Sequence, residues 1–243
     1  MLKNTLITFT MKKLLTIALC MVLFTTAKSQ VYLQGGVNLS NITTLQSRGT
    51  QSNSPLTTFN VGILDRLKIV GLLDFETGLL VDGRGAKSKI NINGEDYYTA
   101  KFNPFYVEVP ANLVLRLPFP AKAKIFLNAG PYIAMGIAGQ TRIDGNIGGV
   151  TLGSTADIKF NNSNPNENNV AYSQLNLIDY GLNIGGGFDF RNVFLKINYE
   201  MGFAKVNATQ IDNFSNDSNK YQIVNISLGF PLSDFYKNSN KKS

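Results

Sequence analysis

Residues 193–203 read VFLKINYEMGF and show the clearest strand pattern in the chain. Every second residue is large and apolar, and most residues between them are polar or small. One set is Val193, Leu195, Ile197, Tyr199, Met201 and Phe203, and the other is Phe194, Lys196, Asn198, Glu200 and Gly202. Because successive side chains of a β-strand point to opposite faces, the stretch predicts a strand with one apolar face and one mostly polar face.

The same alternation recurs along the chain, whereas the period of 3.6 residues that is typical of an amphipathic helix is not found. Eight strands are predicted, at residues 31–40, 57–67, 73–82, 105–117, 125–137, 178–190, 193–203 and 224–230. Glycine, asparagine and serine punctuate the intervals between these strands, as is usual for turns and loops.

The predicted connections alternate in length from one strand to the next. The long ones are 41–56, 84–98, 139–174 and 207–219, and the short ones lie near residues 68–69, 118–122 and 191–192. Bacterial transmembrane barrels have short periplasmic turns and longer extracellular loops. The order long, short, long therefore favours a closed, antiparallel, up-and-down transmembrane β-barrel of about eight strands over a soluble sandwich.

The composition of the two faces favours lipid outside the barrel and a narrow, crowded interior. The polar face carries Asp74, Glu76, Asp82, Glu108, Arg116, Asp179, Asp189, Lys196 and Glu200, together with Gly78, Gly130, Gly136, Gly181, Gly185, Gly187, Gly202 and Gly229. An exposed soluble surface would be richer in lysine and glutamate and poorer in glycine. The alternative is a soluble periplasmic barrel or sandwich, which would place the apolar face inside. Candidates for aromatic girdles at the membrane interfaces are Tyr32, Tyr106, Tyr180, Tyr199, Tyr221 and Phe230.

The first 29 residues have the layout of a cleavable secretory signal peptide. Lys12 and Lys13 precede an apolar run at 14–24, and small residues at Ala27 and Ser29 mark a cleavage site. Met11, directly before the two lysines, is an alternative to Met1 as the initiator methionine. Cleavage would remove four lysines and lower the formal net charge from +7 to +3, and it would also remove Cys20, the single cysteine. The predicted domains are thus a signal peptide at 1–29, an outer-membrane barrel at 30–230, and a polar basic tail at 231–243.

Several short motifs resemble the Bacteroidetes-type outer-membrane β-barrel domain, often labelled "porin family". They are residues 34–41 (QGGVNLSN), 106–110 (YVEVP), 129–132 (AGPY), 179–182 (DYGL) and 185–187 (GGG), in the order that this family has them. The resemblance implies an outer-membrane barrel, and for one subgroup a part in protein export or gliding machinery. Members usually end on an aromatic residue of the last strand, whereas here Phe230 is followed by 231–243.

The chain contains no histidine, which removes the common nucleophilic triads and the commonest metal ligand. No catalytic, cofactor or metal site is predicted. A polar cluster facing the lumen is predicted from Asp74, Glu76, Glu108, Arg116, Asp179, Asp189, Lys196 and Glu200. We expect its acids to pair with Arg66, Arg116 and Lys196. The alternative is a carboxylate-dependent barrel enzyme using Asp74 with Glu76, or Glu108 with Glu200.

An eight-stranded barrel is only wide enough for side chains to fill its interior. We therefore predict an outer-membrane protein with a filled polar lumen and a structural or surface-interaction role through its long loops. The expected partners are outer-membrane lipid, the barrel-assembly machinery during insertion, and an unidentified envelope protein, but no nucleic acid and no cofactor. The alternatives are an export or gliding component, a small-solute pore, and a lipid-modifying enzyme.

Overall fold

The predicted strands pair edge to edge into a closed ring. The computed structural model describes residues 29–43, 53–93, 96–119, 123–160, 174–190, 192–206 and 219–232, which excludes the predicted signal peptide up to Lys28 and most of the predicted tail. The strands are β1 (Ser29–Thr43), β2 (Asn53–Val70), β3 (Leu73–Gly83), β4 (Ala86–Asn93), β5 (Asp96–Phe119), β6 (Ala123–Ile147), β7 (Val150–Asp157), β8 (Lys159–Phe160), β9 (Gln174–Leu175), β10 (Ile178–Phe190), β11 (Val193–Gly202) and β12 (Lys220–Pro231).

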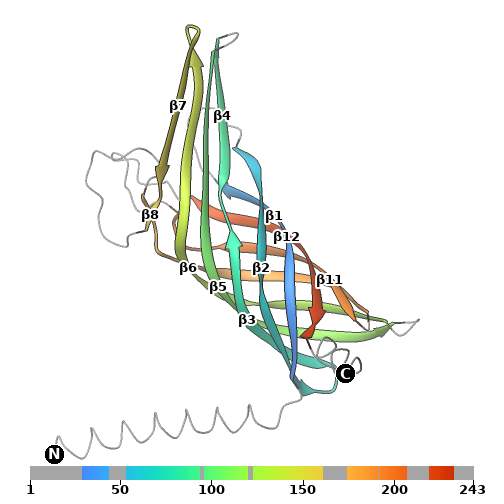
Figure 1. Cartoon of the computed structure of the whole chain (residues 1–243). Coiled ribbons are helices and arrows are strands. Elements are labelled where there is room, and N and C mark those ends of the chain that lie inside the picture. Colours follow the sequence, from blue (N-terminus) through green and yellow to red (C-terminus); the bar gives the residue numbers. More distant parts are fainter. Residues whose placement is uncertain are drawn as a thin grey trace, which may run out of the picture.

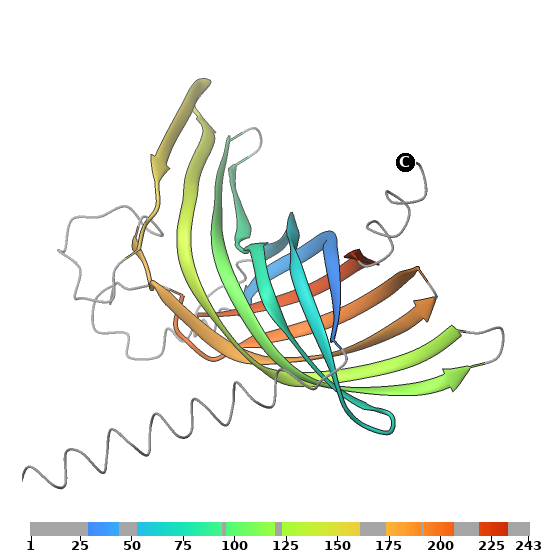
Figure 2. The same cartoon turned by 60° about the horizontal axis from the view of Figure 1, so that its bottom comes forward.

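Eight of these strands form the ring, in the order β1-β2-β3-β5-β6-β10-β11-β12 and back to β1 (Figure 1). Every pairing in the ring is antiparallel, and Tyr32 of β1 opposite Pro231 of β12 closes it. The strands curve around one interior (Figure 2). Closure leaves no sheet edge unpaired within the ring, as a lipid environment demands. The predicted fold class is confirmed.

The two faces of each strand meet different surroundings, as the alternation predicts. In β12 the buried residues include Asn225 and Ser227, whereas Ile226 and Leu228 between them are 45% and 46% exposed. The interior of the barrel is therefore polar and its outer surface is apolar. No helix in the described ranges is long and apolar enough to span a membrane.

Three of the aromatic residues proposed for the interfacial girdles point inward instead. Tyr32, Tyr106 and Tyr221 are buried, whereas Tyr180 and Phe230 are exposed at the outer surface. The physical reason is the alternation itself, because Tyr106 shares its face with the interior residue Glu108, two positions away. These three tyrosines belong to the interior packing.

Lumen glycines leave space for large rings inside the barrel. A Cβ atom on Gly229 would lie 2.1 Å from the ring of Phe194, and one on Gly136 would lie 2.2 Å from the ring of Phe160. Since a barrel of eight strands has a narrow interior, each ring needs a small residue opposite it.

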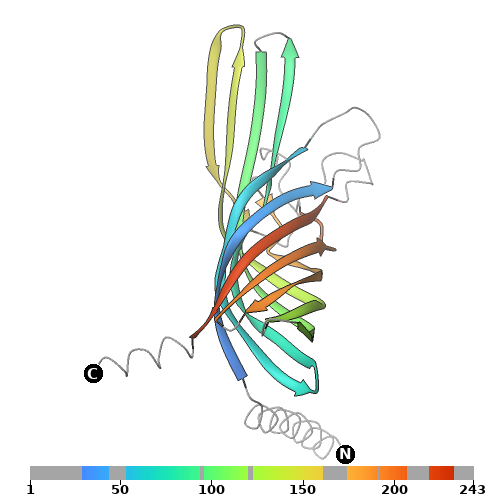
Figure 3. The same ribbon diagram turned by 90° about the vertical axis from the view of Figure 1, so that its right-hand side faces the viewer.

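Two segments predicted as loops instead contain strands. The region 84–98 forms a hairpin of β4 and β5, and the region 139–174 begins with a hairpin of β6 and β7, whose turn is Gly148-Gly149 with φ of +60° and +80°. These hairpins pair with each other through β5 and β6, from Tyr97 opposite Asn146 to Asn103 opposite Gln140. The resulting four-stranded sheet β4-β5-β6-β7, here called the protruding sheet, stands beyond the ends of the other strands (Figures 1 and 3). The prediction was wrong here because these strands are polar on both faces in many positions, and this weakens the apolar alternation.

The first short turn is also displaced from its predicted place near residues 68–69. β2 continues to Val70, with a register shift between Lys68 and Val70, and the turn is formed by Gly71 and Leu72. Gly71 has φ +55°, a conformation that glycine adopts without steric cost.

The apolar outer surface ends where the protruding sheet begins. On β5 the outward residues change from Val107 and Phe105 to Asn103 and Lys101, and on β6 they change from Ile137 to Gln140 and Arg142. This change of polarity marks the upper limit of the lipid-facing band. The protruding sheet therefore lies in water, at the end of the barrel that has the long connections.

Candidate functional site: the polar interior of the barrel

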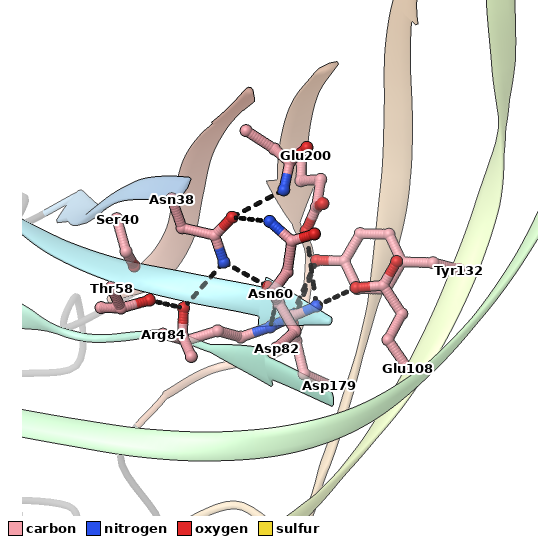
Figure 4. A network of polar contacts seen from close by, with 12 residues as sticks. Asn38, Ser40, Thr58, Asn60, Asp82, Arg84, Glu108, Tyr132, Asp179 and Glu200 are labelled. Carbon is pink, nitrogen blue, oxygen red and sulfur yellow. Dashed lines mark hydrogen bonds and ion pairs between the residues drawn. The ribbon is translucent and has the colours of Figure 1, made fainter. Parts of the chain in front are cut away.

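The centre of the interior polar network is Arg84, which lies directly after β3 and is fully buried. Its Nε atom donates to Asp82 Oδ2 at 2.8 Å, Nη1 contacts Asp179, and Nη2 contacts Glu108 and, at 3.4 Å, Glu200 Oε2 (Figure 4). Four acids from strands β3, β5, β10 and β11 thus surround one guanidinium. We call these five residues, with Tyr132, the Arg84 cluster.

Three tyrosine rings enclose the guanidinium of Arg84. Its central carbon lies 5.3 Å from the ring centroid of Tyr106, 4.9 Å from that of Tyr132 and 5.9 Å from that of Tyr221. The Tyr132 hydroxyl donates to Asp179 Oδ2 at 3.0 Å. The rings therefore shield the cation and orient one of its partners.

A layer of amide side chains lies beside the Arg84 cluster. Asn38 Oδ1 accepts from Asn60 Nδ2 at 2.8 Å and from Asn225 Nδ2 at 2.6 Å, and the Nδ2 atom of Asn38 donates to Asp82 and to the carbonyl of Gly83 at 3.1 Å. Gln34 and Ser227 extend the layer by donating to Asn60 Oδ1, each at 3.2 Å. This layer links the neighbouring strands β12, β1 and β2 with one another and with Asp82 of β3.

A second charged group, here called the Arg66 cluster, occupies the end of the barrel with the short turns. Glu76 accepts from Arg66 Nε at 2.7 Å and from Lys196 Nζ at 2.6 Å. Arg116 contacts Asp74 and lies 3.7 Å from Asp189, while Arg66 lies 3.6 Å from Asp189. Three cations therefore face three acids here, so the formal charges cancel.

The rings around Arg66 complete this cluster. Its guanidinium carbon lies 5.1 Å from the ring centroid of Tyr32, 4.5 Å from that of Phe126 and 4.4 Å from that of Phe194. These rings close the short-turn end of the lumen with apolar surface.

The eight residues of the predicted polar cluster all lie inside the barrel, in two separate groups. The structure places Glu108, Asp179 and Glu200 in the Arg84 cluster, and Asp74, Glu76, Arg116, Asp189 and Lys196 in the Arg66 cluster. The central cation Arg84 is absent from the prediction because residue 84 is the first residue of a predicted loop. It lies two positions after Asp82, so continuing the alternation by one step would have placed it inside.

Apolar residues close the long-loop end of the lumen. Ile158, Leu175, Val206 and Phe160 pack against the interior tyrosines, and the Phe160 and Tyr106 ring centroids are 5.5 Å apart. Between the two charged clusters, a cavity of about 10 Å³ is lined by residues that include Asp82, Glu108 and Glu200. Such a space holds about one water-sized particle.

Both carboxylate pairs considered for acid–base chemistry are buried, and Asp74 and Glu76 of the first pair are 1% and 0% exposed. Glu108 is 1% exposed, Glu200 is 5% exposed, and both contact the guanidinium of Arg84. A lipid or peptide substrate would have to displace the overlying apolar residues to reach them. The described residues therefore give no open active-site geometry for hydrolysis around these two acids.

The family to which the chain belongs follows from a comparison with known protein families. The outer membrane protein beta-barrel domain family matches residues 25–208. The chain belongs to this family. It is thus an outer-membrane β-barrel protein of bacteria. No curated protein sequence matches it.

Solved structures of outer-membrane barrels are similar to this barrel at low sequence identity. Neisserial surface protein A is 13% identical with a TM-score of 0.38, and the match covers 83% of this chain and 97% of that one. Ail, the attachment invasion locus protein of Yersinia pestis, is 13% identical with a TM-score of 0.36, covering 84% and 99%. The N-terminal β-barrel domain of Pseudomonas aeruginosa OprF is 8% identical with a TM-score of 0.29, covering 84% and 100%.

Proposed function

We propose that this outer-membrane barrel protein acts in surface interaction, with the closed barrel as membrane anchor and the protruding sheet as contact surface. The observation that carries the proposal is the change from apolar to polar outward residues at the base of that sheet. Because the sheet extends past the lipid band at the end with the long connections, it faces the cell exterior. Its strands offer two faces and the exposed edge of β7 to a partner.

The filled interior supports an anchor rather than a diffusion channel. The Arg84 cluster with the amide layer beside it and the Arg66 cluster together fill the lumen, and apolar side chains cover both ends. Stable conducting steps in planar bilayers would contradict this part of the proposal. The export or gliding role that the family resemblance implies stays a prediction, because none of the described contacts tests it.

A row of basic residues supports outer-leaflet lipid as one partner. Lys87, Lys101 and Arg142 are directly opposite one another across β4, β5 and β6, all three are exposed, and the row lies just above the apolar band. Arg142 forms an ion pair with Asp144 at 2.9 Å, but Lys87 and Lys101 are like charges directly opposite each other, so an anionic group lying across them would relieve their repulsion. Lys101 and Arg142 also line a surface groove of about 510 Å³. Phosphate groups of outer-leaflet lipids lie at this depth and have the complementary charge.

Removing the protruding sheet tests the contact function. Residues 88–100 and 143–154 would each be replaced by Asn-Gly, which joins the paired residues Lys87 and Lys101, and Arg142 and Thr155, through two-residue turns. Cells that display the full chain should aggregate and attach to serum-coated surfaces. Cells that display the shortened chain should do neither, while its barrel keeps heat-modifiable gel mobility. Equal attachment by both proteins would overturn the proposal.

The lipid partner is tested by charge reversal at matched positions. Added lipopolysaccharide should raise the thermal unfolding midpoint of the wild type in zwitterionic nanodiscs, and the K87E/K101E variant should lose this rise. The control K68E/K124E reverses two exposed lysines at the opposite end of the barrel and should keep that rise. The same response in both variants would exclude the basic row as the lipid contact.

A further inference from the structure

The Arg84 cluster contains more negative charge than the residues around it neutralise. It combines the acids Asp82, Glu108, Asp179 and Glu200 with one guanidinium. Lys196 also lines the cavity beside these acids, but its Nζ atom is bound to Glu76 of the Arg66 cluster at 2.6 Å. Burying carboxylates without a compensating positive charge costs folding free energy. A further positive group near the Arg84 cluster would lower this cost.

Three buried amide oxygens that have no hydrogen-bond partner among the described residues point to the same place. They are Asn183 Oδ1, Gln34 Oε1 and Asn112 Oδ1, and their residues are each no more than 2% exposed. All three residues line the cavity of about 10 Å³ that Asp82, Glu108 and Glu200 also line. A water molecule in this cavity has only two hydrogens to donate, whereas a cation attracts all the surrounding oxygens at once.

We propose that the barrel binds one calcium ion in this cavity, held by the carboxylates of Asp82, Glu108 and Glu200. The three unpartnered amide oxygens, of Gln34, Asn112 and Asn183, complete a shell of six ligands. Ligand atoms of the three carboxylates lie within 4.8 Å of one another. Two oxygens on opposite sides of a calcium ion are about 4.8 Å apart, given Ca–O distances of roughly 2.4 Å. Arg84 contacts the Oε2 atoms of Glu108 and Glu200, so it leaves their Oε1 atoms to the ion.

The size of the cavity selects calcium over magnesium. Magnesium usually keeps several of its waters in protein sites, whereas calcium accepts a full shell of protein oxygens. A cavity of about 10 Å³ has no space for additional waters. Apolar residues seal the lumen above the cluster, so the ion would enter while the barrel closes and would then exchange slowly.

The ion has a structural role in this proposal and is independent of the proposed surface function. Its ligands come from β1, β3, β5, β10 and β11, so one ion would join five strands around the ring. The ligands lie on strands far apart in the sequence and form no local metal-binding motif, so the sequence alone does not predict a metal site.

The test is to count calcium in the folded full-length chain. The protein would be unfolded with a chelator, refolded with calcium into zwitterionic detergent that contains no lipopolysaccharide, and desalted through chelator before elemental mass spectrometry. The wild type should retain about one ion per chain. The E108Q/E200Q variant should fold, because glutamine removes the excess charge at constant size, but should retain none.

A control and a second variant separate the site from surface binding and from misfolding. D144N removes an exposed acid of the protruding sheet and should leave the retained calcium unchanged. N183A keeps every charge of the cluster and should fold but lose the ion during the chelator step. A folded wild type that retains no calcium would overturn the proposal and show that protons neutralise the cluster. Calcium that persists in E108Q/E200Q would overturn it as well.

Discussion

The two charged clusters of the lumen satisfy their central arginines in opposite ways. Arg84 directs Nε, Nη1 and Nη2 to four acids, so acceptors outnumber the cation. Arg66 makes its short ion pair through Nε alone, and its Nη1 and Nη2 atoms have no hydrogen-bond partner among the described residues. Aromatic rings cover the guanidinium of Arg66 instead, and Lys196 shares its acid.

This difference shows where each cluster is vulnerable. Around Arg84 a single cation holds a surplus of acids, so no other side chain replaces it. Around Arg66 the charges are balanced and two cations share Glu76, so the loss of one leaves the other in place. The predictions below test this asymmetry.

The largest effect is expected from Arg84→Met. It leaves four buried carboxylates without their guanidinium, and breaking a buried ion pair by removing one partner costs about 3–5 kcal/mol. We expect the folded fraction to collapse at neutral pH. Folding yield from heat-modifiable gel mobility, followed by urea unfolding in lipid vesicles, measures the effect.

The matched comparison is Arg116→Met at the other end of the barrel. The Arg116 side chain is 14% exposed and its cluster contains two other cations, so the loss in unfolding free energy should be clearly smaller. Equal losses of unfolding free energy in Arg84→Met and Arg116→Met would show that the two clusters do not differ in their dependence on a single cation.

A smaller effect is expected from Arg66→Met. Lys196 remains on Glu76, and methionine keeps contact with the rings of Phe126 and Phe194. The lost charged hydrogen bond and the lost cation–π contacts together suggest a decrease of roughly 2–3 kcal/mol in unfolding free energy. Urea titration of both arginine variants under the same conditions gives the ranking, and a cost for Arg66→Met that matches or exceeds that for Arg84→Met would reverse the comparison.

The sequence predicts the ring better than it predicts the clusters, and the reason is physical. Alternation is a local property of each strand, so VFLKINYEMGF alone shows which side chains share a face. Which interior residues meet depends on the register between strands far apart in the chain. Arg84 and Glu200, for example, are separated by 116 positions. The protruding sheet was missed for another reason, since strands in water on both faces do not show the apolar alternation of a lipid-facing strand.

Glycine substitutions test how firmly each end of the lumen is packed. A Cβ atom on Gly229 would meet Phe194, a fully buried ring of β11 that stacks on Arg66. Such overpacking costs typically about 1–3 kcal/mol, which urea unfolding would detect for Gly229→Ala.

Gly136→Ala is the counterpart at the long-loop end and should cost less. Its Cβ atom would meet Phe160, which belongs to the two-residue strand β8 and is only partly buried, so the ring can move aside. A cost for Gly136→Ala equal to that of Gly229→Ala would show that the residues closing the long-loop end are held as rigidly as the barrel wall.

The smallest effect is expected from Asp144→Asn on the protruding sheet. Asp144 lies 2.9 Å from Arg142, and their side chains are 43% and 66% exposed. An exposed ion pair contributes roughly 0–1 kcal/mol and is screened by salt, so the unfolding free energy of the barrel should barely change, and any change should vanish at high ionic strength. Urea unfolding at low and high salt measures this. A loss as large as that for Arg66→Met would mean that the protruding sheet and the barrel unfold as one cooperative unit, because only then would a contact outside the lipid band weaken the ring.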